Sequence, residues 1–371
     1  MKHPRKLIRG LVGGGLLLLV GGIILSACNP EYRPLAEGPY YEIHIVSDTT
    51  YWNGTVGEAI RDELAKPIIT LPQPEPAFDL VFNPLISRQM FEQVKKKQNI
   101  VIAAPLDGDT PTARFLRDRL DSAVVRLVRE GKQYIFQRPN LWYRDQMVVY
   151  ITAPTAEILA QVIHQEGENL RYLFNTLARQ RLARKMFAPG RETEIEEHLM
   201  ERHDFMVQVQ LDYVLVQDTL TFVRLRRVLP DTWRDLFVYY IENGNPELIE
   251  PEWIYRIRDS LTQVYVRGTR PDSYVKIDRR RPLVSKNINF LGRFAYETRG
   301  LWHLTGDAMG GPFLNYTFYD EKQHRIYMID GMVFAPGYPK REFLRQLEVI
   351  AYTFRTRQEV ESGQDKTNGV Q

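Results

Sequence analysis

The chain has 371 residues, of which 44% are hydrophobic and 26% are charged, a composition that is ordinary for a globular protein. Its formal net charge is +3, but residues 1–27 carry four basic residues and no acidic one, so the remainder has a net charge of about −1. That balance gives no support for nucleic-acid binding, and we expect no nucleic-acid partner.

The first 28 residues have the three-part layout of a secretion signal. Four Lys and Arg residues precede an apolar core at residues 11–25, which is shorter than the roughly 20 residues that a membrane span needs. Leu-Ser-Ala-Cys follows at residues 25–28, a pattern typical of the cleavage and acylation site of a bacterial lipoprotein. We therefore expect residues 1–27 to be a cleaved signal peptide and Cys28 to carry a lipid.

A lipid on Cys28 predicts where the protein is held. Several acyl chains on one residue make stable anchoring, because each buried CH₂ adds about 0.8 kcal/mol. Cys28 is the only cysteine, so no thiol would remain for disulfides, redox chemistry or metal ligation. Asn29 follows it, where an aspartate would signal retention in the inner membrane. We expect the periplasmic face of the outer membrane, with the membrane and possible envelope proteins as partners.

The next segments alternate between strand and helix patterns. Residues 28–39 contain three prolines and predict a short extended tether. We expect the first α+β half over residues 40–190. The patterns predict strands at 41–47, 77–82, 99–104 and 147–152, and helices at 53–65, 112–130 and 155–187.

Residues 191–356 predict a second half of the same kind. The patterns predict strands at 206–216, 221–227, 236–241, 291–304, 313–319 and 325–334, and helices at 251–263 and 339–355. Residues 357–371 lack apolar periodicity and predict a disordered tail. The strands, hairpins and helices together predict an α+β fold with mainly antiparallel sheets and flanking helices, in two similar α/β-sandwich halves.

Residues 299–313, RGLWHLTGDAMGGPF, are the most unusual segment. Two adjacent glycines before a proline are not expected in regular structure, because glycine permits positive φ or close backbone approach. In a binding loop, Trp302 would offer an apolar platform and Arg299 an anion contact. In a structural turn, Trp302 would instead pack in the core and Arg299 would pair with an acid. The candidate binding residues are Arg299, Trp302, His303, Asp307, Gly310 and Gly311.

Signatures of catalysis and of metal binding are missing from the sequence. His198 and His203 lie five apart, which turns the second about 140° away from the face that a zinc helix would use, so we expect a solvated helix end there. The chain has no nucleophile elbow, Walker loop or dinucleotide fingerprint. We therefore expect no cofactor, assign no catalytic or metal-binding residue, and leave open a site assembled from distant residues.

Several short motifs resemble a known family. They are Leu71–Pro76, Arg299–Trp302, Met309–Phe313, Gly331–Pro336, Lys340-Arg341 and Arg345–Glu348. Together with the cysteine motif, they resemble an uncharacterised family of Gram-negative envelope lipoproteins, classed as a domain of unknown function. Ala308 departs from the pattern, which has an aromatic residue there. The resemblance implies a location and an approximate size, but no activity, ligand or catalytic residue.

These observations favour a lipid-anchored envelope protein that binds or scaffolds another envelope component without catalysis. Two alternatives stay open. The first is a periplasmic hydrolase of cell-wall or glycan material that would use acids, or His303 and Asp307, near the glycines. The second is a binder of a small apolar or anionic ligand.

Overall fold

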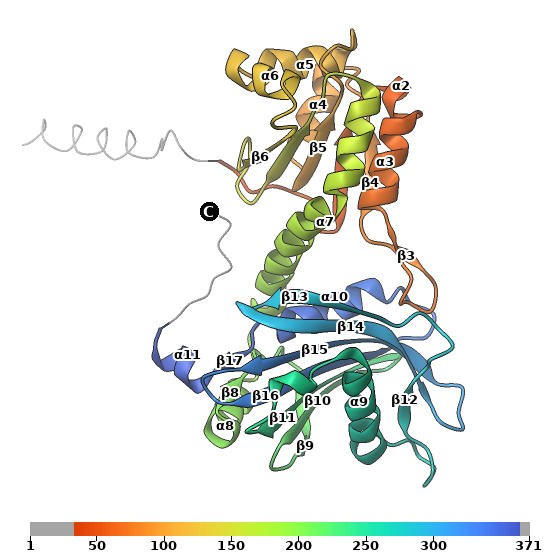
Figure 1. Cartoon of the computed structure of the whole chain (residues 1–371), viewed down its shortest axis with the longest axis vertical. Coiled ribbons are helices and arrows are strands. Elements are labelled where there is room, and N and C mark those ends of the chain that lie inside the picture. Colours follow the sequence, from red (N-terminus) through yellow and green to blue (C-terminus); the bar gives the residue numbers. More distant parts are fainter. Residues whose placement is uncertain (1–32, 364–371) are drawn as a thin grey trace, which may run out of the picture.

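A computed structural model describes residues 33–363 (Figure 1). The predicted signal peptide, Cys28 and the last part of the predicted tail lie outside this range. The described chain carries one sheet within residues 42–151 and a larger one within residues 213–334, which we call the cores of the N-terminal and C-terminal halves, and the long helix α7 (Ala156–Phe187) runs from one towards the other (Figure 1). Within residues 33–363, no helix is long and apolar enough to cross a membrane.

The N-terminal half is built on a five-stranded sheet in the order β4-β1-β5-β7-β6. Its strands are β1 (Glu42–Val46), β4 (Asp79–Asn83), β5 (Asn99–Ala103), β6 (Ile135–Pro139) and β7 (Met147–Ile151), and a separate two-residue ladder joins β2 (Pro67–Ile68) to β3 (Glu75–Pro76). Its helices besides α7 are α2 (Thr49–Trp52), α3 (Thr55–Leu64), α4 (Arg88–Val94), α5 (Pro111–Arg119) and α6 (Ser122–Arg129).

Helices cover both faces of this sheet. Ile43 and Ile45 of β1 pack in a cluster with side chains of α3 and α7, whereas Val46 packs in a second cluster with side chains of α4, α5 and α6. Alternate residues of a strand point to opposite faces, so both faces of the central strands are apolar. The half is therefore a three-layer α/β/α unit.

The C-terminal half is built on an eight-stranded sheet in the order β12-β14-β15-β16-β11-β10-β9, with β13 also paired to β14. Its strands are β9 (Tyr213–Asp218), β10 (Phe222–Leu229), β11 (Thr232–Glu242), β12 (Val275–Ile277), β13 (Val284–Phe290), β14 (Arg293–Leu304), β15 (Gly310–Asp320) and β16 (Arg325–Phe334). The remaining elements are α8 (Thr193–His203), β8 (Phe205–Met206), a 3₁₀ turn (Pro246–Leu248), α9 (Pro251–Tyr265), α10 (Arg341–Ala351), β17 (Arg355–Thr356) and α11 (Arg357–Glu361).

Different helices pack on the two faces of the large sheet. One face packs on α9, where the fully buried Arg258 binds Asp330 of β16 through Nε at 2.8 Å. The other face packs on α8, α10 and the end of α7, and Leu182 and Met186 of α7 belong to that core. Because α7 also contributes to the core of the N-terminal half, it ties the two halves together.

The α+β class with mainly antiparallel sheets is confirmed, because every pairing in the large sheet is antiparallel. The expectation of two similar halves is wrong. In the N-terminal sheet β1 pairs in parallel with β4 and β5, β5 pairs in parallel with β7, and β6 alone is antiparallel. Helices connect these strands as crossovers, which parallel pairing requires.

Three local expectations also change. The helix predicted at 112–130 is two helices, because the Asp121 side chain caps α6 by accepting from Val124 N at 2.9 Å. The predicted tether contacts the folded chain from residue 33 onwards, because Ala36 N donates to Arg144 O at 2.9 Å. The predicted tail begins with α11, which has a capping box formed by Thr356 and Glu359.

Candidate functional site between the two halves

A cleft of about 720 Å³ lies where the two halves meet, and we call it the interhalf cleft. Its walls come from four parts of the chain that are far apart in sequence. These are the segment around β2 and β3 at 66–77, one face of α7 at 168–179, strands β13 and β14 at 284–299, and α10 with the residue that follows it at 341–352. Ligand sites often lie between domains, so this is the leading candidate.

Helical spacing places the α7 residues on one side of the cleft. The lining residues of α7 recur at intervals of three and four, which brings them onto a single face of the helix. The members of this row are Glu168, Tyr172, Asn175 and Arg179, with Asn169 and Thr176 beside them. The face thus runs from an exposed rim at Tyr172 to a half-buried base at Arg179.

A network of charges forms the base of the cleft. Arg299 of β14 donates through Nη2 to Glu297 at 2.9 Å and to Glu348 of α10 at 3.0 Å. Glu348 also accepts from Arg179 Nη1 at 3.0 Å, and the Arg179 guanidinium lies 3.6 Å from the ring centre of Tyr352. The network therefore connects α7, the sheet and α10.

The network holds its members in defined protonation states. Burial alone would raise the pKa of Glu297, but the charge and hydrogen bond of Arg299, with help from Lys286, outweigh it and lower the pKa to about 2. Burial, together with Glu348 and Glu297, raises the pKa of Tyr316, which donates to Glu297 at 3.1 Å. Glu297 thus stays ionised and Tyr316 stays protonated at neutral pH.

Arg299 has hydrogen-bond donors that no described residue uses. Within residues 33–363, every hydrogen bond of Arg299 leaves from Nη2, so Nε and Nη1 of the same guanidinium face no protein acceptor. Its side chain is 23% exposed, so these donors are reachable from the cleft. An anionic group in the cleft would therefore find a charged donor at its base.

Contacts between the halves close the cleft on one side. Arg341 of α10 binds both carboxylate oxygens of Asp79 at 3.0 Å. Glu75 accepts from Lys340 N at 2.6 Å and from Arg341 N at 3.1 Å, so a residue of the N-terminal half caps helix α10. Arg345 donates to Ala77 O at 2.7 Å. The Leu71–Pro76, Lys340-Arg341 and Arg345–Glu348 motifs therefore meet at this junction.

The six candidate binding residues do not form one loop. The segment is a hairpin of β14 and β15 with a turn at 305–309. Arg299 and Trp302 are three apart in a strand, so they point to opposite faces of the sheet. Arg299 lies in the interhalf cleft, paired with acids, and Trp302 packs on the α9 face against Trp233. Both side chains therefore have the contacts expected of a structural segment, and Arg299 alone also lines a cleft.

The remaining four residues lie at the turn end of the hairpin. Gly310 and Gly311 belong to β15, so the expectation that they lie outside regular structure is wrong. Gly311 is needed for close approach, because a Cβ there would lie 1.9 Å from Val333 O. His303 is half-buried in β14 opposite Lys276, and Asp307 is exposed and accepts from Ala308 N at 2.6 Å.

Sequence reasoning missed most of the cleft. Arg179, Glu297, Glu348 and Thr176 were not singled out, because none of them lies in a local catalytic pattern. The charged motifs at 340–348 were the available signal, since they place Arg341, Arg345 and Glu348 at intervals of three and four, on one face of a predicted helix.

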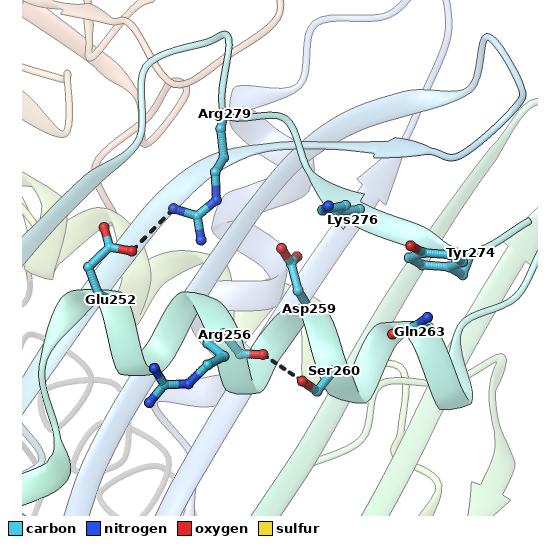
Figure 2. A pocket seen from close by; sticks show the side chains of 8 residues that line it. All are labelled: Glu252, Arg256, Asp259, Ser260, Gln263, Tyr274, Lys276 and Arg279. Carbon is cyan, nitrogen blue, oxygen red and sulfur yellow. Dashed lines mark hydrogen bonds and ion pairs between the residues drawn. The ribbon is translucent and has the colours of Figure 1, made fainter.

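A second, shallower groove of about 450 Å³ lies between α9 and β12 (Figure 2). Its charged groups hold the two elements together. Arg279 binds Glu252 at 3.3 Å, and Asp259 accepts from Ile277 N at 2.8 Å. The groove is open, and Glu252, Arg279 and Asp259 already have partners, so we rank it below the interhalf cleft.

The two histidines of α8 have a structural role. His198 and His203 bind the two oxygens of Asp218, at 2.7 and 2.9 Å, and His203 also contacts Tyr240 OH at 3.1 Å. His203 is buried, which corrects the expected solvated helix end. Across residues 33–363, no group of three or more His, Cys, Asp and Glu side chains has an arrangement that could hold a metal ion.

Solved structures show only faint similarity to this chain, and no curated protein matches it. The Ran-binding protein Mog1p of Saccharomyces cerevisiae aligns at 11% identity, over 42% of this chain and 90% of that one, with a TM-score of 0.29. A mutant of Mog1 gives 11% identity, 41% and 90% coverage, and a TM-score of 0.28. A Bacteroides thetaiotaomicron protein aligns at 10% identity, over 42% of this chain and 46% of that one, with a TM-score of 0.24.

Two family models match, one in each half. Residues 36–187 match a domain of unknown function, DUF8532, and residues 192–353 match another, DUF4837. The two matches meet at the end of α7. Each part of the chain is thus similar to a domain of unknown function.

Proposed function

We propose that the chain is a lipid-anchored, non-catalytic binding protein of the bacterial envelope, and that it binds its ligand in the interhalf cleft. The observation that carries the binding role is the cleft itself, which both halves line and which has open donors at its base. Its volume of about 720 Å³ lies within the range of small-molecule sites.

The chemistry of the lining favours binding over catalysis. The lining residues include no His, Ser or Cys, so the described cleft lacks the Ser–His and Cys–His pairs of nucleophilic catalysis. A glycosidase needs a carboxylic acid that is protonated near neutral pH. Glu297 cannot supply it with a pKa of about 2, and Arg299 lies between Glu297 and Glu348, where a substrate would have to enter.

The hydrolase centred on His303 and Asp307 has less support. Asp307 lies on an exposed turn and bonds to the backbone of its neighbour. Neither His303 nor Asp307 lines the interhalf cleft. A carboxylate in water has no neighbour that would tune it for acid–base work.

The anchoring part of the proposal rests on the sequence around Cys28. We expect Cys28→Ala to remain uncleaved or to leave the outer-membrane fraction, because no thiol is left to acylate. Fractionation with mass spectrometry of the N-terminal peptide measures this. Membrane retention equal to that of the unaltered protein would contradict the anchor.

The binding part can be tested in cells with a photocrosslinking amino acid. It would be placed at Tyr172, which is 66% exposed at the cleft rim, and as a control at Val264, which is 60% exposed on α9. We expect a reproducible adduct with an envelope component from position 172 only, reduced by Arg299→Lys. Equal adducts from both positions, or none from position 172, would overturn binding in the cleft.

A further inference from the structure

We propose that the ligand of the interhalf cleft is an anionic amphiphile: a single-chain molecule with a carboxylate or phosphate head and an apolar tail. This inference rests on the proposed function, and it names the chemical class that the cleft would accept. The head would bind at the charged base and the tail would lie against the rim.

The charge of the cleft favours an anion. Seven basic side chains line it: Lys66, Arg171, Arg179, Lys286, Arg299, Arg341 and Arg345. Three acidic side chains line it, Glu168, Glu297 and Glu348, and three more bind the basic residues from behind, namely Glu63, Asp79 and Glu342. One positive charge remains in excess, which a ligand with a single negative charge would neutralise.

The base of the cleft has the geometry to recognise a carboxylate or phosphate. Nη1 of Arg299, which no described acceptor uses, is a charged donor that is able to bind one oxygen of an oxyanion. Lysine is not equivalent to Arg299 here, because its one nitrogen would be held by Glu297 and Glu348 and no second nitrogen would remain for an anion.

The rim of the cleft is apolar and exposed. Ile69, Tyr172 and Val284 are 52%, 66% and 41% exposed, and all three line this one cleft from three separate elements. Large apolar side chains that gather around a concave site indicate a surface that is covered in use. A purely polar anion would leave this rim in water, whereas a neutral lipid would leave the donors at the base unpaired.

Calorimetric titration tests this ligand class. The full mature chain carrying Cys28→Ser would be used, so that its own acyl chains do not compete. The probes are dodecanoate, dodecyl phosphate, dodecanol, acetate and inorganic phosphate, the amphiphiles being kept below their micelle concentrations. We expect at least one of the two anionic amphiphiles to bind about tenfold or more tighter than dodecanol, and the two short anions to bind more weakly still. The tighter of the two amphiphiles identifies the head group.

Matched variants locate the ligand. Arg299→Lys should weaken binding about tenfold with melting unchanged, while Arg256→Lys, in the shallow groove, should not weaken it. Ile69→Ala, at 52% exposure, should weaken binding of the tailed probes, and Leu248→Ala, at 50%, should not. Because Ile69 is exposed, its variant keeps the test informative if Arg299→Lys fails to fold.

Two results would overturn the proposal: dodecanol binding as tightly as both anions, or acetate or phosphate binding as tightly as its tailed counterpart. If no amphiphile binds but the crosslinker at Tyr172 still captures an envelope component, the ligand class is wrong and the binding cleft stands. If no amphiphile binds and the crosslinker at Tyr172 captures nothing, the proposed binding function fails as well.

Discussion

Single residues in this protein are constrained by what lies next to them in space. His44 is a clear case, because it is buried in β1 with Nδ1 3.3 Å from Asn83 Nδ2. Burial and the nearby Lys97 lower its pKa from 6.5 to about 4, although Glu42 lies 3.6 Å from Nε2 and favours the charged form. The native protein therefore holds His44 neutral.

Acidification should destabilise the protein through His44. The unfolded chain takes up a proton near pH 6.5 and the native state near pH 4, so stability is complete above 6.5 and declines as the pH falls towards 4. The loss from this residue is up to about 3 kcal/mol. Urea unfolding at pH 7 and pH 4.5 measures it, and His44→Gln should show a smaller decline. An equal decline in both proteins would assign the effect to other groups.

Gly311 is constrained by contact rather than by dihedral angle. Gly311→Ala would place a methyl group 1.9 Å from the Val333 carbonyl oxygen in the middle of the sheet, so strands would have to shift. We expect a loss of about 1–3 kcal/mol in the free energy of unfolding. Gly54→Ala, where the nearest atom is 3.3 Å away, is the control and should cost less. Unchanged stability of the Gly311 variant would show that the strands relax freely.

At the scale of elements, local sequence patterns predicted which segments are helices and which are strands. They did not predict which strands pair with one another, or in which direction. The strand predicted at 325–334 coincides with β16, and the last helix contains α10. β5 and β7 are buried at every position, and NIVIA and MVVYI are the continuous apolar runs typical of parallel strands. These two apolar runs are therefore a sequence signal for parallel pairing. Strand β6 has only one buried position and offers little pattern to detect.

Helix α10 depends on a cap from outside its own segment. Its first residues donate to Glu75, and its own N-cap position, Lys340, provides no side-chain bond. Glu75→Ala should therefore lower the free energy of unfolding by about 1–2 kcal/mol. Glu58→Ala, in the first turn of α3, is the control, because α3 has no side-chain cap to lose. Similar losses in the two variants would mean that the cap across the halves is not stabilising.

At the scale of the molecule, the charged network makes the two halves one structure. Glu348 accepts from Arg179 of α7 and from Arg299 of β14. Removing its charge would leave two half-buried guanidinium groups short of an acid, and breaking such buried pairs costs several kcal/mol.

Glu348→Gln should consequently lower the free energy of unfolding by about 3 kcal/mol. Glu252→Gln, which removes an exposed partner of Arg279, should change it by less than about 1 kcal/mol. Chemical denaturation of both variants compares them. A loss at Glu348 no larger than that at Glu252 would show that water and Gln replace the network.

Features that depend on neighbours along the chain could be predicted from the sequence, namely the type of most helices and strands, while the acylation of Cys28 stays a prediction. These features depend on periodicity, on turn residues and on short motifs. Three features became visible only in the folded chain: the two halves differ, Arg299 and Trp302 lie on opposite faces of one sheet, and residues from 66 to 352 line one cleft. Strand pairing and interhalf contacts join segments of distant sequence, and the free energy that selects them comes from burial across the whole fold, which leaves little local trace.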